Sequence, residues 1–371
     1  MRVLEVTESF ATGTMEVVRL IAEQAARDGH AVAIAYGVRP ETPADLGQRI
    51  GAEVEQVELP WAGRTLLAQL RAARALRRLC RDWKPDVVHL HSSFAGAVGS
   101  LAIPRGIPTV YTPHAYSFLT TRSRLSRVLY RSAERFIARR TSMVGAVSKS
   151  EARLARDVGA TSVEVIPNGI PELDQPPTAT RSPSEPPAVV TVGRIVRQRQ
   201  PAATARIMAS VADIAAVEWI GGPGPDESLA GDVRALGIPV TGWLDRDVAV
   251  RRLSQATVLL NWSAWDSHPL GVLEAMAFDV LVIGSDIEAN RDLLGAEQVR
   301  ASEDQAAELL REVLTDRDRR EELLETQRAR SRPFAASQMA RDWLRIYDRL
   351  TAFQVAAKPR ARRAGVDRLT A

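Results

Sequence analysis

The feature that most constrains the fold is an alternation of short apolar runs with longer amphipathic stretches. In the first half of the chain the runs are RVLEVTE, AVAIAYG, PDVVHLHSS, IPTVYTPHA, SMVGAVSKS and VEVIPNGI. In the second half they are AVVTVGR, VEWIGG, IPVTGW, ATVLLNWSA and VLVIGS. Such runs, separated by helical patterns, are typical of βαβ units in a parallel sheet that is buried on both faces. We therefore predict an α/β protein with two Rossmann-like, doubly wound domains.

A proline-rich stretch separates the two halves. Residues 171–187 read PELDQPPTATRSPSEPP, and prolines at this density remove backbone donors and fix φ, which excludes helix and central strand. We predict a linker there, between a first domain at 1–170 and a second at 188–332. A length of 371 residues agrees with two domains, because one hydrophobic core rarely spans so many.

The end of the chain divides into two parts. The stretch 333–352 places Met339, Trp343 and Ile346 on one helical stripe, which needs a surface to cover it. We expect this helix to pack back on the first domain. The segment 353–371 is basic, contains Pro and Gly and has few apolar residues, so we predict that it is disordered.

Composition excludes several classes of protein. No stretch is long and apolar enough to cross a membrane, and the start of the chain lacks the pattern of a secretory leader, so we expect a cytoplasmic protein. The single Cys80 excludes an intramolecular disulfide and a cysteine-rich metal site, and we expect it to be a small buried hydrophobe. A formal net charge of +4 suits an anionic partner and does not require nucleic acid.

The residues after the run ATVLLNWSA form the first candidate site, because ligands of open α/β sheets bind beyond the carboxyl ends of strands. Asp266 follows this run, and Pro269 suits the first turn of the next helix. The N–H groups of Leu270 and Gly271 would then be donors at a positive helix end, which favours a phosphate. An acidic residue that complements the helix dipole is the alternative for Asp266. That alternative explains Glu274, one turn further on, less well.

The run AVVTVGR is followed by cations. Arg194 ends it and Arg199 comes five residues later, so we interpret them as two guanidiniums that converge on one diphosphate. Two solvated side chains are the alternative in a chain so rich in arginine. We also place Gly222, Gly224 and Trp243 in the vicinity of a nucleotide, since glycines after a strand permit close backbone approach.

The first domain offers an anion site and a histidine. Gly13 lies at the start of an amphipathic helix after the first run, where backbone amides can clamp a phosphate. The three-glycine dinucleotide fingerprint is absent there, so we expect no nicotinamide cofactor. His114 ends the run IPTVYTPHA and is our candidate for polar contacts in a cleft, with a structural role as the alternative. His89 and His91 share one strand face, but no third metal ligand lies near them in sequence, so we prefer buried polar packing.

Taken together, these features resemble the retaining, nucleotide-sugar-dependent glycosyltransferases of GT-B fold, in the large family 4-like group of bacterial polysaccharide and glycolipid synthesis. The most specific parts are VSKSEARLA followed by VIPNGI, the VGR with Arg199 after it, and the acid, seven residues, Glu pattern that ends in LEAMA. The resemblance covers the chain from about Met1 to Leu350.

The resemblance implies a role for each candidate. Glu274 would bind the nucleotide ribose, Asp266 and the amides after it would hold the donor sugar, and His114 would contact that sugar from the other domain. The catalytic residues implied are His114, Arg194, Arg199 and Asp266, and the donor-binding residues are Gly13, Ser267, His268, Pro269, Leu270, Gly271 and Glu274.

The chain departs from the family pattern in three respects, which involve four positions. The family usually has Glu where this chain has Asp266, Lys where it has Arg199, and often Gly at Ser267 and Pro269. The first change shortens a sugar contact by one methylene. The second keeps the charge and changes its geometry.

The reaction implied is retaining transfer of a hexosyl unit from a UDP- or GDP-sugar to a hydroxyl of a sugar or lipid-linked acceptor in cell-envelope glycoconjugate synthesis. Front-face attack, in which the leaving phosphate takes the acceptor proton, needs no protein nucleophile. No Asp-x-Asp ends a strand at the expected cleft, so we expect neither a metal nor another cofactor. A non-catalytic homologue that binds a nucleotide sugar or a partner stays open, as does an epimerase of the same fold.

The segment TRSRLSRVLYRSAERFIARR predicts an amphipathic helix. Its arginines form one stripe at helical spacing, and its apolar residues are expected to lie toward the sheet. The arginines are Arg124, Arg127, Arg131, Arg135 and Arg139, and the apolar residues are Leu125, Val128, Leu129 and Phe136. The stripe is either a solvated face or a surface that docks on the anionic inner face of the plasma membrane.

Overall fold

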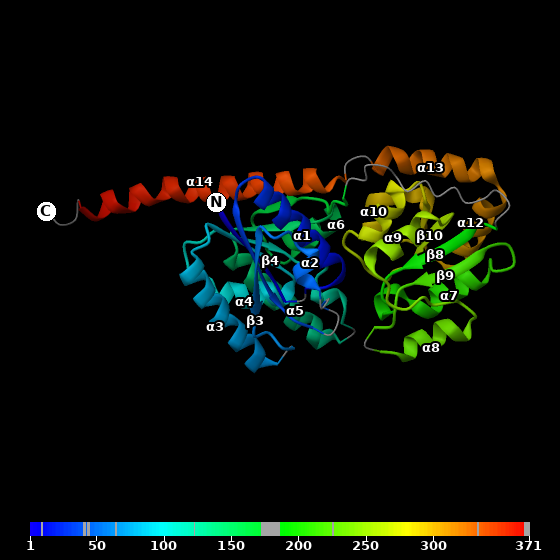
Figure 1. Ribbon diagram of the computed structural model, residues 1–371, viewed down its shortest axis with the longest axis horizontal. Helices are drawn as coiled ribbons and strands as arrows, with labels where there is room; N and C mark the ends of the chain where they lie inside the picture. The colour runs from blue at the N-terminus through cyan, green and yellow to red at the C-terminus, as the bar shows by residue number, and fades with distance from the viewer. Residues whose placement is uncertain are drawn as a thin grey trace. The chain divides into compact units, whose positions relative to one another are not determined.

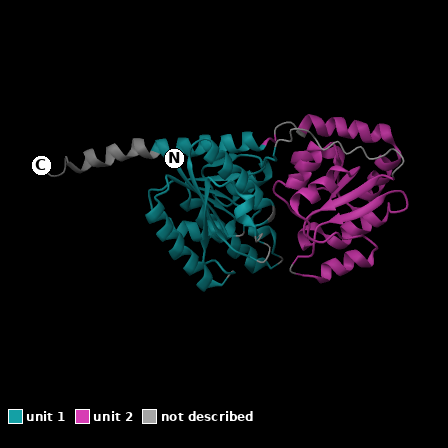
Figure 2. Ribbon diagram, viewed as in Figure 1, with its two compact units in different colours: residues 1–171, 336–371 teal, residues 172–335 magenta. Residues whose placement is uncertain are grey.

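The chain folds into two compact units, which Figure 2 distinguishes by colour. Unit 1 comprises Met1–Pro171 and Ala336–Ala371, and unit 2 comprises Glu172–Ala335. The computed structural model describes residues 1–366 except 9, 40–41, 43–44, 64, 122, 172–185, 225 and 332–333. Most of the predicted linker, 171–187, therefore lies outside the described residues. The predicted α/β class is confirmed, because each unit is built on a parallel sheet covered by helices.

Unit 1 contains a seven-stranded sheet with the order β3-β2-β1-β4-β5-β6-β7. The pairs between neighbouring strands are all parallel. The strand order reverses at β1 and β4, which is where ligands of such sheets bind, beyond the carboxyl ends of the strands. The strands are β1 (Arg2–Thr7), β2 (Ala31–Gly37), β3 (Val54–Leu59), β4 (Val87–His91), β5 (Thr109–Thr112), β6 (Met143–Ala146) and β7 (Val163–Val165).

The helices of unit 1 cover both faces of this sheet (Figure 1). Helices α1 and α14 pack against each other, while α3, α4 and α5 form a row of neighbours. The helices are α1 (Thr12–Arg27), α2 (Leu46–Arg49), α3 (Leu66–Trp83), α4 (Ser93–Ala102), α5 (Arg124–Arg140), α6 (Lys149–Asp157) and α14 (Ala336–Val366), with a 3-10 turn η1 (Ser117–Leu119).

Helix α14 packs on α1 and on strand β4. Trp343 and Tyr347 of this helix are buried. A Cβ at Gly145 of β6 would come within 2.0 Å of the Trp343 ring, so only glycine fits there. The helix runs to Val366, well beyond residue 352, where the sequence pattern predicts its end. The predicted disorder of the segment 353–371 stays a prediction.

Unit 2 contains a five-stranded parallel sheet with the order β12-β11-β10-β8-β9. Its first strand, β8, lies between β9 and β10, so the switch point of this sheet lies beside β8. The predicted strand IPVTGW forms only an isolated bridge between Val240 and Trp219. The strands are β8 (Ala188–Val192), β9 (Ala216–Ile220), β10 (Val258–Asn261), β11 (Leu281–Ser285) and β12 (Val299–Arg300).

The helices of unit 2 follow these strands in turn (Figure 1). They are α7 (Pro201–Ala209), α8 (Ser228–Ala235), α9 (Arg246–Ser254), α10 (Leu270–Ala277), α11 (Glu288–Leu294), α12 (Glu303–Thr315) and α13 (Arg317–Ser331), with 3-10 turns η2 (Arg197–Arg199) and η3 (Ala296–Gln298).

One prediction about α5 is wrong. Its apolar residues Leu125, Val128, Leu129 and Phe136 face solvent in unit 1, with exposed fractions of 80%, 62%, 67% and 43%. They lie on the side of the helix opposite its buried residues, and arginines flank them. Helical spacing was therefore correct, but the face assigned to the sheet was the opposite one.

The face of α5 that packs is fixed by a buried carboxyl group. Glu134 is 1% exposed and accepts hydrogen bonds from the hydroxyl groups of Ser93, at 2.5 Å, and Tyr111, at 2.8 Å. Ile137 and Ala138 are buried on the same side. Because a buried carboxyl group without partners is costly, these bonds decide which side of the helix lies on the core.

Candidate functional site

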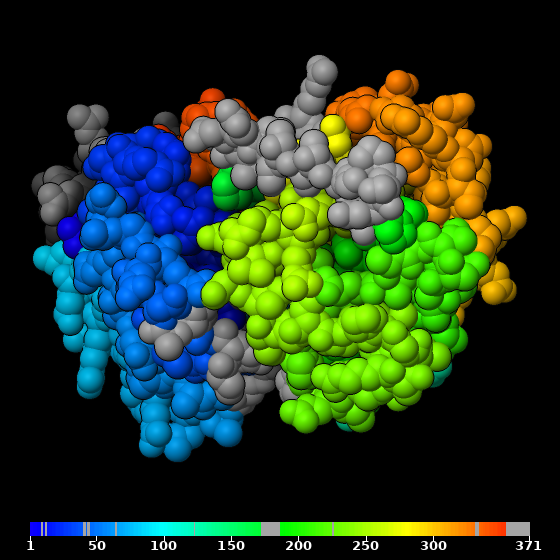
Figure 3. Space-filling model, turned by 45° about the vertical axis from the view of Figure 1, so that its right-hand side comes forward, coloured from blue at the N-terminus to red at the C-terminus, as the bar shows by residue number. Residues whose placement is uncertain are grey.

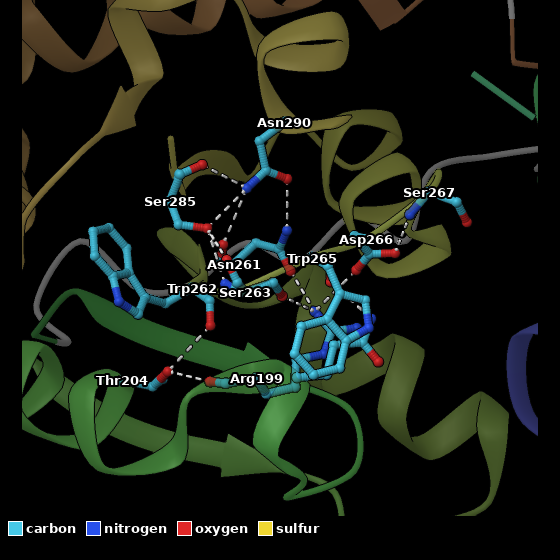
Figure 4. Close-up of polar contacts among 11 residues, drawn as sticks. Arg199, Thr204, Asn261, Trp262, Ser263, Trp265, Asp266, Ser267, Ser285 and Asn290 are labelled. Carbon is cyan, nitrogen blue, oxygen red and sulfur yellow. Dashed lines mark hydrogen bonds and ion pairs between the residues drawn. The ribbon is translucent and has the colours of Figure 1, made fainter. Parts of the chain in front are cut away.

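Two loops of unit 2 meet at the carboxyl ends of β8 and β10, beside the switch point. The amide N–H of Ala264 donates to the carbonyl of Gln198 at 2.8 Å, and the side chain of Gln198 donates to the carbonyl of Trp265 at 3.0 Å. These bonds tie the turn η2 to the segment after β10. The predicted residues Arg199 and Asp266 are thereby brought together, although they are far apart in sequence (Figure 4).

The Arg199 guanidinium is held by three groups from the β10 side. It donates to Oδ1 of Asn261 and, at 3.4 Å, to the hydroxyl of Ser263. Its Nη1 lies 3.9 Å from Oδ2 of Asp266. The Arg199 side chain is 19% exposed. A cation fixed in this way is preorganised for a further anion, because its orientation is set before any ligand arrives.

A second layer of polar residues orients the first, as Figure 4 shows. The Asn261 amide donates to Oδ1 of Asn290 at 2.9 Å, and the Asn290 amide donates to the Ser285 carbonyl at 2.8 Å. Ser285 also donates to the Ser263 carbonyl at 2.6 Å. Sequence reasoning did not identify these residues, because asparagine and serine after strands carry no distinctive spacing.

Asp266 is the buried anion of this cluster. Its Oδ1 accepts from the Ser267 amide at 2.9 Å. Its Oδ2 is buried and, among the described residues, finds no hydrogen-bond donor. Burial raises the pKa of the Asp266 carboxyl, while Arg199 and the Ser267 amide oppose that rise. A buried acceptor without a donor can accept a hydrogen bond from a ligand hydroxyl.

The segment after Asp266 leads into α10. Ser267 and His268 are buried, and burial lowers the pKa of the His268 imidazole to about 3. The His268 ring contacts the edge of Phe334 at a centroid distance of 5.3 Å. Pro269 takes the N-cap position, so the helix begins at Leu270. A Cβ atom at Gly271 would lie 3.8 Å from the Val192 side chain. The predicted helix N-terminus is therefore confirmed as a structural feature.

Glu274 faces a cation that the sequence did not single out. The Arg246 guanidinium, at the start of α9, lies 2.5 Å from Oε1 of Glu274. The exposed fractions of the two side chains are 33% for Arg246 and 13% for Glu274. No sequence signal distinguishes Arg246 from the other arginines of the chain.

The glycine loop after β9 lies beside a tryptophan. A Cβ at Gly222 would come within 2.6 Å of the Trp243 indole, and one at Gly224 within 2.5 Å of Val196. The Trp243 ring itself is 54% exposed. In Figure 3 the lime to yellow-green stretch that includes α8 and α9 forms much of the visible surface of unit 2. Arg194, two residues after β8, is half-buried.

The predicted residues of unit 1 are Gly13 and His114. Gly13 is exposed in the first turn of α1, which has no side-chain cap. His114 and Ala115 both have positive φ, 48° and 83°, which is strained for residues other than glycine. Glu151 holds this turn, because it accepts from the amides of Ala115 at 2.9 Å and Val147 at 2.8 Å.

His114 continues into a buried polar cluster. Its Nε2 lies 2.9 Å from Nδ1 of His91, whose Nε2 lies 2.7 Å from Oε2 of Glu5. His89 lies beside them, 2.6 Å from the Tyr347 hydroxyl. Both β4 histidines are thus buried and hydrogen-bonded, and the preference for a packing role over a metal-binding role stays a prediction.

Glu5 supplies the third group that the sequence did not reveal. Ligand atoms of Glu5, His89 and His91 lie within 4.8 Å of one another, close enough to hold an ion. However, both ring nitrogens of each histidine already have protein partners. This arrangement fits a hydrogen-bonded core better than a metal centre.

Comparison with known proteins gives matches over both units. Residues 11–172 match the family model described as Glycosyltransferase Family 4. Residues 186–316 match the model described as Glycosyl transferases group 1.

Two curated relatives match parts of the chain. The 2-deoxystreptamine N-acetyl-D-glucosaminyltransferase of Streptomyces fradiae is 28% identical over 262 residues, 62% of this chain and 61% of the relative. The UDP-Gal:alpha-D-GlcNAc-diphosphoundecaprenol alpha-1,3-galactosyltransferase of Escherichia coli is 24% identical over 258 residues, 62% of this chain and 65% of the relative. The matches thus span less than two thirds of each relative's length.

Solved structures share the fold over nearly the whole chain. Sucrose-phosphate synthase from Thermosynechococcus elongatus has a TM-score of 0.80 at 19% identity, with 95% of this chain and 99% of the other covered. Anabaena HepE in complex with UDP-glucose has a TM-score of 0.74 at 16% identity, with 96% and 100% covered. At such identities the likeness concerns the fold alone.

Proposed function

Because this chain belongs to the GT-B glycosyltransferases of the family 4 type, we propose that it transfers a sugar from a nucleoside-diphosphate sugar to an acceptor hydroxyl, with retention at the anomeric carbon. We place the reaction in the synthesis of a cell-envelope glycoconjugate. UDP is the first candidate nucleotide, since UDP-glucose is bound in the similar Anabaena structure and the Escherichia coli relative is named for a UDP-sugar.

The observation that carries this proposal is the fixed Arg199 guanidinium beside the buried Asp266 and the start of α10. As the glycosidic bond breaks, negative charge grows on the leaving diphosphate. A preorganised cation and helix N-terminal amides stabilise that charge without reorganising, which lowers the barrier. In this proposal Arg199 and Arg194 bind the diphosphate, and Oδ2 of Asp266 accepts a hydrogen bond from a hydroxyl group of the donor sugar.

The remaining candidates receive roles on the same basis. Glu274 accepts hydrogen bonds from the ribose hydroxyls, and Arg246 holds its carboxylate in place. Trp243 offers a half-exposed indole beside Gly222, which suits stacking on a base. Because charge neutralisation comes from the chain itself, we propose that the reaction requires no divalent ion.

A thermal-shift screen tests the nucleotide assignment. UDP, GDP, ADP and dTDP are each added to the full chain, and a nucleotide present at 100 times its dissociation constant should stabilise the fold by about 2.7 kcal/mol. Stabilisation by none of them would refute nucleotide binding. Incubation with the matching sugar nucleotide, followed by product analysis, then separates a transferase, which consumes donor, from a binding subunit, which does not.

We also propose that unit 1 docks on an anionic membrane through α5. No helix among the described residues is long and apolar enough to cross a membrane. The exposed residues Leu125, Leu129 and Phe136 lie opposite the packed face of α5, with arginines beside them. Apolar side chains flanked by cations fit the headgroup region of an anionic bilayer better than they fit bulk water. Each arginine near that surface contributes about 1 kcal/mol.

A lipid-linked acceptor would make such docking useful, and the name of the Escherichia coli relative includes a diphosphoundecaprenol-linked sugar. The full chain should co-sediment with phosphatidylglycerol liposomes at low salt. The triple variants Leu125→Ser/Leu129→Ser/Phe136→Ser and Arg127→Gln/Arg135→Gln/Arg139→Gln should each lose binding.

The control variant removes three exposed arginines of unit 2, Arg234, Arg251 and Arg317, each replaced by Gln. It lowers the charge equally and should sediment like wild type. If the wild-type protein does not co-sediment with the liposomes, or the control loses as much binding as the α5 variants, the exposed face of α5 is only a solvated surface.

A further inference from the structure

A chain of hydrogen bonds runs from a buried carboxyl group to His114 in unit 1. We propose that Glu5, His91 and His114 form a proton relay, in which the protonation state of Glu5 decides which ring nitrogen of His114 carries its proton. Glu5 and His91 are thus positioning residues that act through His114. The use of this device in catalysis rests on the proposed function, whereas the relay itself does not.

Each link of the relay joins one atom to one atom. Oε2 of Glu5 lies 2.7 Å from Nε2 of His91, and Nδ1 of His91 lies 2.9 Å from Nε2 of His114. Glu5 and His91 are both fully buried, while His114 is partly exposed. Because Nε2 of His114 is bonded to His91, Nδ1 is the ring nitrogen that lies outside this chain of hydrogen bonds.

Two proton arrangements satisfy every link. When Glu5 is protonated, it donates to Nε2 of His91, whose Nδ1–H donates to Nε2 of His114, so Nδ1 of His114 carries a proton and is a donor. When Glu5 is ionised, it accepts from Nε2–H of His91, whose Nδ1 accepts from Nε2–H of His114. Nδ1 of His114 is then an acceptor. A neutral imidazole has one N–H and one lone pair, so the hydrogen bond at one nitrogen fixes the other.

The groups around Glu5 hold the carboxyl in place in either state. From α14, the Tyr347 hydroxyl donates to Oε1 of Glu5 at 3.1 Å. From β4, His89 lies 3.4 Å from Oε2, and its Nε2 is bonded to the Thr112 hydroxyl at 2.8 Å. The neighbour across β2 is Ile34, which does not titrate.

The charged residues of α1 form their own group. Arg19 of this helix pairs with Glu16 and Glu23, each at 2.7 Å. No cation among the described residues is paired with Glu5. Its carboxyl group is therefore surrounded by neutral hydrogen-bonding groups.

Because of burial, the Glu5 carboxyl is the group of the relay that titrates at the highest pH. Burial raises the pKa of Glu5 to about 8 and lowers that of His91 to about 3. Burial lowers the pKa of His114 as well, and the neighbouring His91 adds to this shift. Both imidazoles therefore stay neutral across the range in which Glu5 loses its proton, which the relay requires.

In the proposed reaction, His114 contacts the donor sugar. A sugar hydroxyl has a single donor hydrogen, so one that already donates to another group can only accept a hydrogen bond from His114. The relay would therefore match His114 to the sugar in one protonation state of Glu5 only. The fold holds His114 in a strained turn at φ 48°, which persists only because surrounding contacts fix it.

Nitrogen-15 NMR of the full chain with labelled histidine tests the relay without any ligand or turnover. The shifts distinguish a protonated from an unprotonated ring nitrogen. In wild type, His91 and His114 should exchange tautomers together with one midpoint near pH 8, and neither should become an imidazolium. His268, in unit 2, is the internal reference. If His114 gains a second proton with its own midpoint, or does not change while His91 does, the relay is refuted.

Glu5→Gln provides the second measurement. Its amide oxygen can accept from Tyr347 while its NH₂ donates to His91, which mimics the protonated acid. Both histidines should then stay in the Nδ1–H form at every pH. The matched control is Glu134→Gln, another buried acid with a raised pKa, about 7, that is bonded to Ser93 and Tyr111. It should keep the wild-type titration.

The outcomes separate the relay from a general effect. If Glu5→Gln titrates like wild type, or Glu134→Gln abolishes the change as well, the relay is refuted. If Glu5→Gln does not fold, the wild-type titration alone decides. Should the coupled titration be found while no sugar nucleotide is consumed, the proposed function fails and the relay stands.

Discussion

Replacing Arg199 by alanine separates the structural from the ligand-binding role of this residue. In the free protein the guanidinium is bonded to Asn261 and Ser263 and lies 3.9 Å from Asp266. Removing one partner of a buried ion pair typically costs about 3 to 5 kcal/mol. Here the cost should be smaller, because the pKa of Asp266 is already raised by burial and the group can take up a proton instead.

Arg199→Ala should also weaken ligand binding, and this effect is distinct from the loss of stability. A hydrogen bond to a charged group contributes about 1.5 to 3 kcal/mol, so Arg199→Ala should raise the dissociation constant of the bound nucleoside diphosphate by about 10- to 150-fold. Arg199→Lys should lose less affinity, because it keeps the charge but not the two-pronged geometry. Calorimetric titration measures the affinity, and thermal unfolding measures the stability.

The double variant Arg199→Ala/Asp266→Asn is the decisive comparison. It removes both members of the pair, so stability should return toward that of wild type, while affinity for the diphosphate should stay low. If Asp266→Asn restores the affinity together with the stability, Arg199 serves only to neutralise Asp266. The assignment of Arg199 to the diphosphate would then be abandoned.

Three further predictions concern Glu274, divalent ions and Glu5. Glu274→Gln should weaken nucleotide binding by about 1 to 2 kcal/mol, because a neutral amide replaces a charged hydrogen-bond acceptor. Unchanged affinity would rule out the ribose contact. Turnover should persist in excess EDTA, and its loss there, with recovery on adding magnesium or manganese, would disprove a metal-free reaction. Because burial raises the folded pKa of Glu5 from 4.5 to about 8, its contribution to stability is full below pH 4.5 and is lost as the pH rises through 8. Glu5→Gln should flatten the fall in unfolding free energy between pH 4.5 and about 8, and an equal slope in both proteins would contradict this.

The fold could be predicted because parallel strands buried on both faces read as continuous apolar runs. β3 was not predicted, since VEQVEL at the edge of the sheet contains as many polar as apolar residues, and β12 spans only two residues. On α5 the spacing predicted an amphipathic helix but not its packed face. That choice depends on Glu134, whose partners Ser93 and Tyr111 come from other elements.

The candidate site was predictable only where a residue has a distinctive place in sequence. Asp266 follows a strand and precedes a proline and a helix, so its position could be identified. Arg246 and Asn290 are indistinguishable in sequence from solvated residues, and contacts across 28 or 29 positions bring them into the site. Glu5 escaped for the same reason, because it lies beside His89 only through the pairing of β1 with β4.

Both units place a buried polar network at the carboxyl ends of their central strands, and each network is incomplete at one point. In unit 2 the residue is Asp266, whose Oδ2 is buried without a described donor, and in unit 1 it is His114, which is bonded inward through one nitrogen. Packing apolar residues at such positions would usually be as stable or more stable, so stability alone does not account for these networks. Networks that are rigid within and open at one end fit ligand binding, because they fix the direction of the last donor or acceptor before the ligand arrives.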